Sequence, residues 1–398
     1  MAMPDYDVSA ALDTDYYSVF SAFGTVSAED RAHWERARAF IDEALPQMNE
    51  YWDRAEYPLH LVKRMGELNL LADGIEVPGL EPMSPLAAGL VNMEISRGDG
   101  SLGTVVAVQG GLALRSIAFH GSEEQKERWL GPLARGEELG SFALTEPDHG
   151  SDSVSLETTA RLDGDHWVLD GEKKWIGNGA SGGVTVVWAR DEEGDVRGFL
   201  VEQDAPGYEA EVIEGKGSLR AIHQARIRLE GVRIPKDSVL PGARTFKDTS
   251  AVLVATRLGV AWSALGHATA AYEAAVNYAG QRVQFGKPLA KFQLVQDRLS
   301  QMLAELTSMQ LHCVHLARLD AAGQMRPTQA SMAKYHNTRK ARFIASTARD
   351  LLGGNGILLE NHVVRHMMDI ESIHTYEGTE SVQALLIGRD VTGVGAFA

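Results

Sequence analysis

The segment Thr375-Tyr376-Glu377-Gly378-Thr379-Glu380-Ser381 follows a glycine-rich turn at 353–356 and precedes the apolar run 382–387. Glu377 therefore stands between an aromatic residue and a glycine, which makes the local backbone pliable. Burial raises the pKa of a glutamate, so a carboxylate in such a place can act as a general base near neutral pH. The alternative is that Glu377 caps the helix that the apolar run predicts, because acidic residues are common at helix starts.

The composition predicts a soluble, acidic protein with more than one domain. The chain has 398 residues and a formal net charge of −16, which is too long for one core and too acidic for nucleic acid or an anionic membrane surface. A single cysteine, Cys313, excludes an intrachain disulfide and fits a reducing compartment. No apolar run is expected to span a membrane, and residues 1–30 contain no Lys or Arg, which argues against a leader peptide. The expected location is the cytoplasm.

Changes in periodicity divide the chain into three parts. After an irregular lead-in at 1–25, apolar residues recur mostly at helical spacing, and Ser27 and Ser122 begin capping sequences. Short β-branched and aromatic runs separated by Gly-containing turns then predict a small sandwich or barrel. Four long Ala-rich helical patterns follow, at 250–281, 289–319, 328–352 and 380–391. The predicted fold is mainly α with a β insert: an N-terminal helical domain (1–140), a middle β domain (141–242) and a C-terminal four-helix bundle (243–398).

Two motifs with a chemical interpretation are rejected. Gly177-Asn178-Gly179-Ala180-Ser181-Gly182 matches a dinucleotide-binding fingerprint, but that fingerprint requires a following helix, and 184–188 has a strand pattern. We interpret the motif as a turn. The pairs His362/His366 and His312/His315 have helical metal spacing but lack the glutamate of a zinc-protease motif, so we predict no metal site.

Two further segments combine residues suited to ligands. Phe142–Ser151 joins the helical and β domains, where clefts form, and offers hydroxyls and backbone N–H groups to a polar, partly anionic ligand. Arg282–Leu289 is an interhelical turn with an arginine suited to phosphate. Each also has a purely structural interpretation, as a β-turn and as a helix C-cap respectively.

Taken together, these segments resemble the acyl-CoA dehydrogenase family, in the family's order and over nearly the whole chain. The segment 375–381 is similar to the one that carries the family's catalytic glutamate. Other segments are similar to its two flavin-facing strands, to the part that reaches a neighbouring subunit's flavin and to the stretch that contacts the cofactor across the dimer: 142–151, 175–178, 282–289 with Gln293, and 350–354. The ending 388–393 is most similar to the glutaryl-CoA dehydrogenase branch.

The resemblance implies the three-domain fold of that family, one FAD per subunit and a homotetramer built as a dimer of dimers. It implies α,β-dehydrogenation of an acyl-CoA, with electron-transferring flavoprotein as the acceptor. In that reaction Glu377 removes the α-proton and the β-hydrogen leaves as hydride to flavin N5, while the Glu377 N–H polarises the thioester carbonyl. Thr256, which stands where some branches carry the base, cannot serve as one.

The resemblance also assigns binding residues. The implied cofactor-binding residues are Phe142, Leu144, Thr145, Gly150, Ser151, Trp175, Ile176, Gly177, Arg282, Phe285, Gln293, Asp350, Leu351, Gly353, Gly354, Thr379 and Ser381. The implied substrate-binding residues are Ser151, Gly103, Thr104, Arg257 and Gly378.

Two departures from the family pattern affect the expected activity. Glutaryl-specific enzymes carry Arg and Ser where Gly103 and Thr104 align, and a buried carboxylate without a cationic partner is strongly disfavoured. We therefore predict a short uncharged acyl chain and no decarboxylation. Many members carry Thr at Gly177, where its hydroxyl bonds flavin N5, whereas the short-chain acyl-CoA oxidases of plant peroxisomes also have glycine.

Three alternatives follow. The first is an oxidase that uses O2, against which the ending 395–398 lacks a peroxisomal tripeptide. The second is a glutaryl-CoA dehydrogenase. The third is a non-catalytic flavin-binding protein, against which the presence of Glu377 counts.

Overall fold

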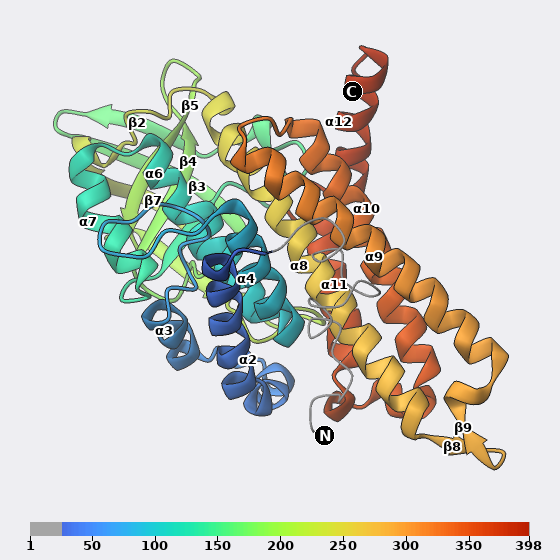
Figure 1. Cartoon of the computed structure of the whole chain (residues 1–398). Helices are drawn as coiled ribbons and strands as arrows, with labels where there is room; N and C mark the ends of the chain where they lie inside the picture. Colours follow the sequence, from blue (N-terminus) through green and yellow to red (C-terminus); the bar gives the residue numbers. More distant parts are fainter. Residues whose placement is uncertain (1–25, 398) are drawn as a thin grey trace.

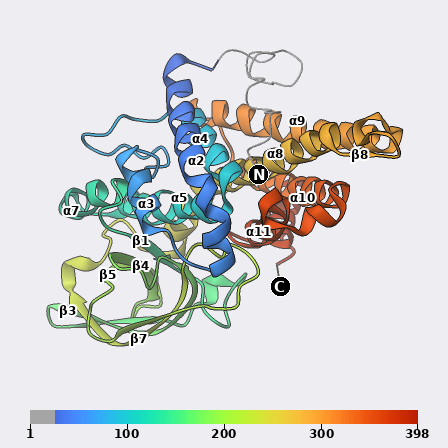
Figure 2. The same ribbon diagram turned by 90° about the horizontal axis from the view of Figure 1, so that it is seen from below.

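The computed structural model describes residues 26–397, so the lead-in predicted at 1–25 lies outside the described residues. Figures 1 and 2 show a sheet on one side of the N-terminal helices and a helical bundle on another. Separate apolar cores join these parts. One unites Leu90 and Met93 with the bundle, and another unites Trp129 and Leu133 with Phe142 and strand residues of the β domain.

The N-terminal part is helical, and two of its starts use the predicted caps. Ser27 Oγ accepts a hydrogen bond from Asp30 N at 3.0 Å, and Ser122 and Gln125 form a reciprocal capping box. The π-helical segment η2 was not predicted. The elements are α2 (Ala28–Arg54), α3 (Leu59–Glu67), α4 (Pro85–Gly98), α5 (Gly100–Val106), η2 (Ala107–Leu114), α6 (Arg115–His120) and α7 (Glu123–Ala134).

The middle part is one seven-stranded, curled sheet with the order β1-β4-β2-β3-β7-β6, and β5 pairs with β4. Its strands are β1 (Gly140–Ala143), β2 (Thr159–Asp163), β3 (His166–Gly177), β4 (Val184–Arg190), β5 (Val196–Glu202), β6 (Tyr208–Val212) and β7 (Gln224–Pro235). Because β4 begins directly after Gly182 and Gly183, the match to a dinucleotide fingerprint is a turn between strands, as interpreted.

The bundle contains the four predicted helices and one more. Its elements are α8 (Phe246–Gln281), the hairpin β8 (Val283–Gln284) and β9 (Lys287–Pro288), α9 (Gln293–Ala321), α10 (Pro327–Leu351), α11 (Val363–Thr375) and α12 (Glu380–Thr392). The sequence did not predict α11, because the buried polar residues Arg365, His366 and Asp369 interrupt its apolar period. This helix delivers the chain to Glu377.

Two helical stretches, 100–120 and 246–281, are long and apolar enough to cross a membrane, contrary to the expectation from the sequence. In each, 67% of the most apolar window is buried inside the fold. They are therefore core helices of this structure.

Helices α4 and α8 approach each other through glycines. A Cβ on Gly266 would lie 2.2 Å from the Met93 carbonyl oxygen and 2.8 Å from Arg97 N. Next to this contact, the buried Arg97 guanidinium bonds Glu94 at 2.6 Å on its own helix and Glu273 at 2.9 Å on α8. This close packing fixes α8 relative to the segment that continues into η2.

We predict that Gly266→Ala destabilises the protein by about 2–3 kcal/mol, because the added methyl meets backbone atoms that cannot rotate away. Gly280→Ala, on the same helix with open space around it, should leave stability unchanged or raise it by up to ~1 kcal/mol through helix propensity. Thermal unfolding of the two variants checks this, and equal melting temperatures would contradict the packing argument.

Candidate active site

The Glu377 carboxylate lies in the connection between α11 and α12 and points inward. Its Oε2 accepts a hydrogen bond from Thr256 Oγ1 at 2.8 Å, and its Oε1 is buried with no hydrogen-bond partner among the described residues. Burial raises the pKa of this carboxyl, although the Thr256 hydrogen bond and the charges of Lys334 and Arg257 oppose the shift. The cap of α12 is Thr379, whose Oγ1 accepts from Val382 N at 3.4 Å. Glu377 is therefore not the cap of α12, and its buried carboxyl has the environment expected of a base.

The backbone at Glu377 is held in the left-handed region, with φ at 53°. The buried Lys334 ammonium donates to the carbonyls of Tyr376 and Gly378, and Gln383 Nε2 donates to the carbonyls of Glu377 and Gly378 at 3.1 Å each. Within residues 26–397 no hydrogen bond engages the Glu377 N–H. The carbonyls are thus occupied, and the N–H remains available to a ligand.

Lys334 is itself perturbed. Burial lowers the pKa of its ammonium to about 8, against the favourable charge of Glu377. Burial likewise lowers the pKa of Arg257, which donates to Ser331 Oγ at 3.3 Å and has a buried Nε without a partner in the described structure. Both cations flank the base from α8 and α10.

Residues from the N-terminal part complete this group. Burial raises the pKa of the Tyr376 hydroxyl, as does the Glu377 charge, while hydrogen bonds with Ser263 and Thr104 oppose the shift. Thr104 is buried, as expected for a residue beside the site. Gly103 faces elsewhere, since a Cβ there would lie 2.3 Å from Ser96 Oγ on α4.

The ends of β1 and β3 form an adjoining wall. Lys174 N donates to the Thr145 carbonyl at 2.9 Å, which joins the two strands beyond Phe142 and Leu144, whose side chains are buried. The Trp175 backbone has a φ of 66°, and the residue is 54% exposed. A Cβ on Gly177 would lie 2.7 Å from Val108 Cγ2 of η2. Since η2 also packs on α8, this segment connects the wall to the helix that carries Thr256.

A buried ion pair anchors the loop after β1. The Glu146 carboxylate accepts from Lys173 Nζ at 2.9 Å, from Glu157 N at 2.7 Å and from Thr158 N at 2.9 Å. Burial opposes ionisation, but Lys173 and these donors hold the pKa of Glu146 down at about 2, while burial lowers that of Lys173 to about 8. The pair fixes both ends of the exposed loop that carries Gly150 and Ser151.

The other predicted site residues lie elsewhere in the subunit. The hairpin β8–β9 is at the end of the bundle farthest from the sheet (Figures 1 and 2). Phe285 at its tip is 93% exposed, and Asp350 bonds Arg298 at 2.7 Å near the same end. These distal residues are Arg282, Phe285, Gln293, Asp350, Leu351, Gly353 and Gly354, of which Leu351 alone is buried. Thr379 is the N-cap of α12 and Ser381 lies in its first turn, close to Glu377 in the chain.

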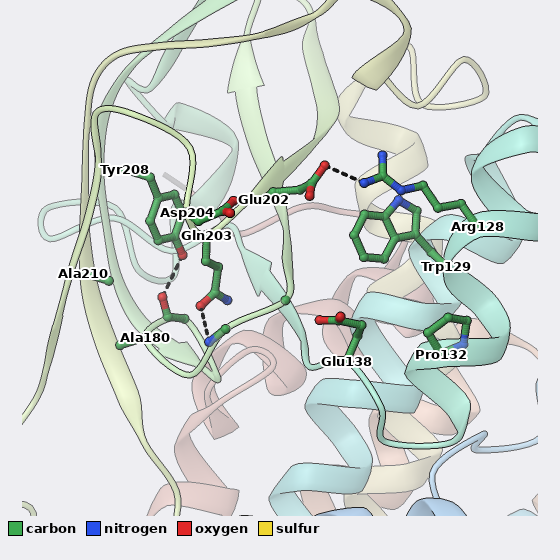
Figure 3. A pocket seen from close by; sticks show the side chains of 13 residues that line it. Arg128, Trp129, Pro132, Glu138, Ala180, Glu202, Gln203, Asp204, Tyr208 and Ala210 are labelled. Atoms are coloured by element: carbon green, nitrogen blue, oxygen red, sulfur yellow. Dashed lines mark hydrogen bonds and ion pairs between the residues drawn. The ribbon is translucent and has the colours of Figure 1, made fainter.

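A cavity of about 630 Å³ lies between α7 and the sheet, away from the base (Figure 3). Its charged lining is mostly acidic: Glu138, Glu202 and Asp204, with Arg128 already bonded to Glu202 at 2.7 Å. Such a lining disfavours phosphate groups. Residues of the turn at 179–183 also line the cavity, whereas neither Glu377 nor its hydrogen-bond partner Thr256 does, so we place the chemistry at Glu377 instead.

Comparison with known proteins identifies the class. Family models of the acyl-CoA dehydrogenase N-terminal, middle and C-terminal domains match residues 27–137, 141–232 and 246–392. The chain therefore belongs to the acyl-CoA dehydrogenase family, oxidoreductases that act on CH–CH donors and use FAD. The fold class, the enzyme class and the cofactor predicted from the sequence are confirmed.

Individual relatives agree with this. The human mitochondrial short-chain specific acyl-CoA dehydrogenase is 39% identical over 338 residues, which cover 83% of this chain and 82% of the human protein. A glutaryl-CoA dehydrogenase structure from Mycobacterium smegmatis has a TM-score of 0.92 at 42% identity, covering 94% of this chain and 97% of that one. A structure of a glutaryl-CoA dehydrogenase from Mycobacterium smegmatis in complex with FADH2 has the same TM-score at 39% identity and the same coverage. A chain in a structure of the electron transferring flavoprotein of Acidaminococcus fermentans has a TM-score of 0.88 at 30% identity, covering 92% of this chain and 99% of that one.

The residues present fit a flavin. The exposed Trp175 residue on a strained backbone and the exposed loop that carries Gly150 and Ser151 leave part of the wall accessible to a planar ring. At the base, Glu377 Oε1 is buried without a partner and the Glu377 N–H is free among the described residues, so both can bind a polar group. The residues that would hold FAD from this subunit are those of β1, its following loop and the end of β3.

Sequence reasoning missed several of these groups. Thr256 was considered only as a base, and Lys334, Gln383, Asp73 and Val108 were not singled out. A lysine or glutamine in a helical pattern carries no local signal of its partner, because the carbonyls that it binds lie 42–44 residues away for Lys334. The local signal in the sequence was Gly378 beside Glu377, which predicted a pliable backbone but no supporting partner.

We predict that Thr256→Val moves the base-dependent limb of the pH–rate profile of flavin reduction to higher pH by about one unit. The Thr256 hydrogen bond stabilises the ionised Glu377 carboxylate, so its loss raises the pKa of that carboxyl. The substitution preserves shape but removes the donor. Thr269→Val on the same helix is the control, because Thr269 bonds only the Leu265 carbonyl at 2.8 Å. A profile that is unchanged by Thr256→Val would show that this hydrogen bond does not act on the base.

Proposed function

We propose that this protein catalyses the α,β-dehydrogenation of a short-chain, uncharged acyl-CoA, with Glu377 as the base. The observation that carries the proposal is the Glu377 carboxyl itself: buried, raised in pKa, and with one oxygen unpaired. A general base is most effective when its pKa approaches the working pH. FAD, when bound, supplies the two-electron oxidation by accepting the β-hydrogen as hydride.

The chain's own residues prepare the proton transfer. Lys334 and Gln383 occupy the carbonyls on both sides of Glu377, so its N–H is directed at a ligand and can stabilise the developing negative charge on a thioester oxygen. Thr256 orients the carboxylate through Oε2, which leaves Oε1 to receive the α-proton. Arg257 and Lys334 limit how far burial can raise the pKa of Glu377, so the carboxylate remains available as a base.

The position of Gly103 supports an uncharged acyl group. It is packed against Ser96, and an arginine there would collide with that side chain. A short chain is also consistent with the relative that is named short-chain specific acyl-CoA dehydrogenase. The relatives named glutaryl-CoA dehydrogenase keep that substrate as a second candidate.

The distal residues support an oligomer, which we propose to be a homotetramer. Phe285 and Leu294 are 93% and 80% exposed, and they surround the predicted cofactor residues Arg282 and Gln293. Residues at that end cannot reach the wall of their own subunit, so they would complete the cofactor site of another copy. We further propose electron-transferring flavoprotein as the electron acceptor, since a chain in a structure described as an electron transferring flavoprotein is similar to this one.

Gly177 keeps an oxidase as another candidate. Residue 177 offers no hydroxyl, and Val108 Cγ2 would lie 2.7 Å from a Cβ at this position. Peroxide formation measured during reoxidation of the acyl-CoA-reduced protein distinguishes the two, because a dehydrogenase should reoxidise slowly in air and rapidly with the flavoprotein. Peroxide release at the rate of turnover would establish the oxidase.

We predict that Glu377→Gln lowers the rate of anaerobic flavin reduction by at least about a hundredfold while FAD remains bound, because the amide cannot accept the proton. Stopped-flow absorbance with saturating butyryl-CoA measures this. Glu380→Gln, which removes a carboxylate three residues away that pairs with Arg339 at 3.1 Å and with His374 at 2.9 Å, is the control. Unchanged reduction in Glu377→Gln would contradict the assignment, and a wild-type protein that no acyl-CoA reduces would favour the non-catalytic alternative.

We predict further that wild-type protein is reduced faster by butyryl-CoA or isobutyryl-CoA than by glutaryl-CoA, because no cation is placed at Gly103 to pair with the far carboxylate. The same stopped-flow measurement compares the three thioesters. Preferential turnover of glutaryl-CoA would refute the uncharged-substrate proposal while leaving Glu377 as the base.

A further inference from the structure

We infer that Asp73, paired with Arg115 beside the catalytic base, makes the site discriminate against acyl groups that carry a free carboxylate. The inference rests on the proposed function, because it assigns a specificity-determining residue to that reaction. The specificity determinant is the Asp73 carboxylate, an anion that is present, and it is separate from the cation that is missing at Gly103.

Asp73 is held against η2 by two glycines. A Cβ on Gly110 would lie 2.0 Å from the Leu71 carbonyl oxygen and 2.9 Å from Asp73 Cβ, so the turn at 71–74 can rest on η2 only where η2 has no side chain. The Asp73 backbone is left-handed, with φ at 47°. This packing fixes the side chain over the next residue, Gly111.

Gly111 lies close both to Asp73 and to Thr256, the residue that bonds the base. A Cβ on Gly111 would lie 3.2 Å from Asp73 Oδ2 on one side and 3.5 Å from Thr256 Cγ2 on the other. Thr256 Oγ1 in turn bonds Glu377 Oε2 at 2.8 Å. The width of a single missing side chain therefore separates the Asp73 carboxylate from the residue that orients the base.

Of the two charges in the Asp73–Arg115 ion pair, the Asp73 carboxylate is the one that acts on the base. Arg115 Nη2 donates to Asp73 Oδ2 at 3.0 Å and to the Asp73 carbonyl at 2.7 Å, and Arg115 Nε donates to the Gly111 carbonyl at 3.2 Å. The guanidinium favours the ionised form of Asp73, although burial raises the pKa of that carboxyl. The Asp73 charge raises the pKa of Glu377, so the base experiences it as a negative charge.

Of the other cations around the base, Lys334 on α10 is used by the carbonyls of Tyr376 and Gly378. Arg257 on α8 donates to Ser331 Oγ at 3.3 Å and keeps a buried Nε without a partner in the described structure. An acyl chain whose α-carbon lies at Glu377 and whose tail extends along η2 approaches Asp73. A neutral tail tolerates this carboxylate, whereas an anionic tail is repelled by it.

The test compares glutaryl-CoA with butyryl-CoA in Asp73→Asn. We expect the glutaryl-to-butyryl ratio of flavin reduction rates at subsaturating substrate to rise by about fivefold, as removal of one partly compensated charge allows. The rising limb of the butyryl-CoA pH profile should also move to lower pH, because a charge that raises the pKa of Glu377 has been removed. Asp163→Asn, which breaks the half-exposed Asp163–Arg233 pair in the β domain, is the matched control and should change neither.

Binding provides a readout that does not depend on turnover. In a Glu377→Gln background, calorimetry should show that Asp73→Asn improves the affinity for glutaryl-CoA relative to butyryl-CoA by the same factor of about five. If Asp73→Asn does not fold because Arg115 is left unpaired, Asp73→Asn/Arg115→Gln removes both charges and should show the same rise in the ratio.

Unchanged ratios in the folded Asp73 variant, by rate and by affinity, overturn the inference. So does a lower ratio, which would mean that the pair attracts a substrate carboxylate through Arg115. Absence of flavin reduction by any acyl-CoA in the wild-type protein instead overturns the proposed function, so the two failures are distinguishable.

Discussion

The buried Lys334 ammonium and the two carbonyls that it binds are the constraint on which the site depends. A non-glycine residue with positive φ costs about 1–3 kcal/mol unless the surroundings hold it there. At Glu377 that support comes from Lys334 on one side and from the Gln383 amide on the other. The strained backbone directs the carboxylate toward Thr256 and leaves the N–H free. Without this support, the base and the donor for the thioester oxygen would both lose their positions.

Each part of the fold contributes one element to this arrangement. The bundle supplies the base and the cations, the β domain supplies the wall at Trp175 and Gly177, and η2 lies between them. Gln109 on η2 accepts from Gly140 N at 2.7 Å at the start of β1, and Gly111 on the same segment faces Thr256. π-helical turns are rare and often mark functional sites. Here η2 presents Gly110 and Gly111 to the loop at 71–74 and to Thr256 on α8, and larger side chains at these two positions would hold those segments apart.

Local sequence signals were sufficient for much of the fold. The Ser122 capping box, the turn pairs of the β domain and the Ala-rich periods of α8 to α10 each depend on nearby residues, and the structure has them where they were expected. The helix α11 escaped because its inward face carries Arg365 and Asp369, which are buried with charged or polar partners from α2, α5 and the loop at 218–221. Such partners are distant in the chain, so a helical pattern that uses them is not apolar.

The same reason limits what the sequence could say of the site. Glu377 was found because its neighbours suggested a pliable, aromatic-lined turn, and a family resemblance supported it. The residues that act on Glu377 were not predicted in that role, because Lys334, Thr256 and Asp73 become its neighbours only through the packing of α10, α8 and η2. Gly103 was aligned with a substrate position of relatives, yet a Cβ there would point at Ser96 on α4, which depends on helix rotation and not on sequence order.

The central claim is that Glu377 is a desolvated carboxyl group whose pKa lies above that of an ordinary glutamate. Infrared difference spectra of the carboxyl C=O stretch, wild-type protein minus Glu377→Gln, recorded across a pH titration of the FAD-bound protein, measure this directly. We expect a protonated band at a frequency typical of an apolar environment, with a titration midpoint above about 4.3, the value for an exposed glutamate. A midpoint at or below that value, or a band typical of a water-exposed carboxyl, would contradict it.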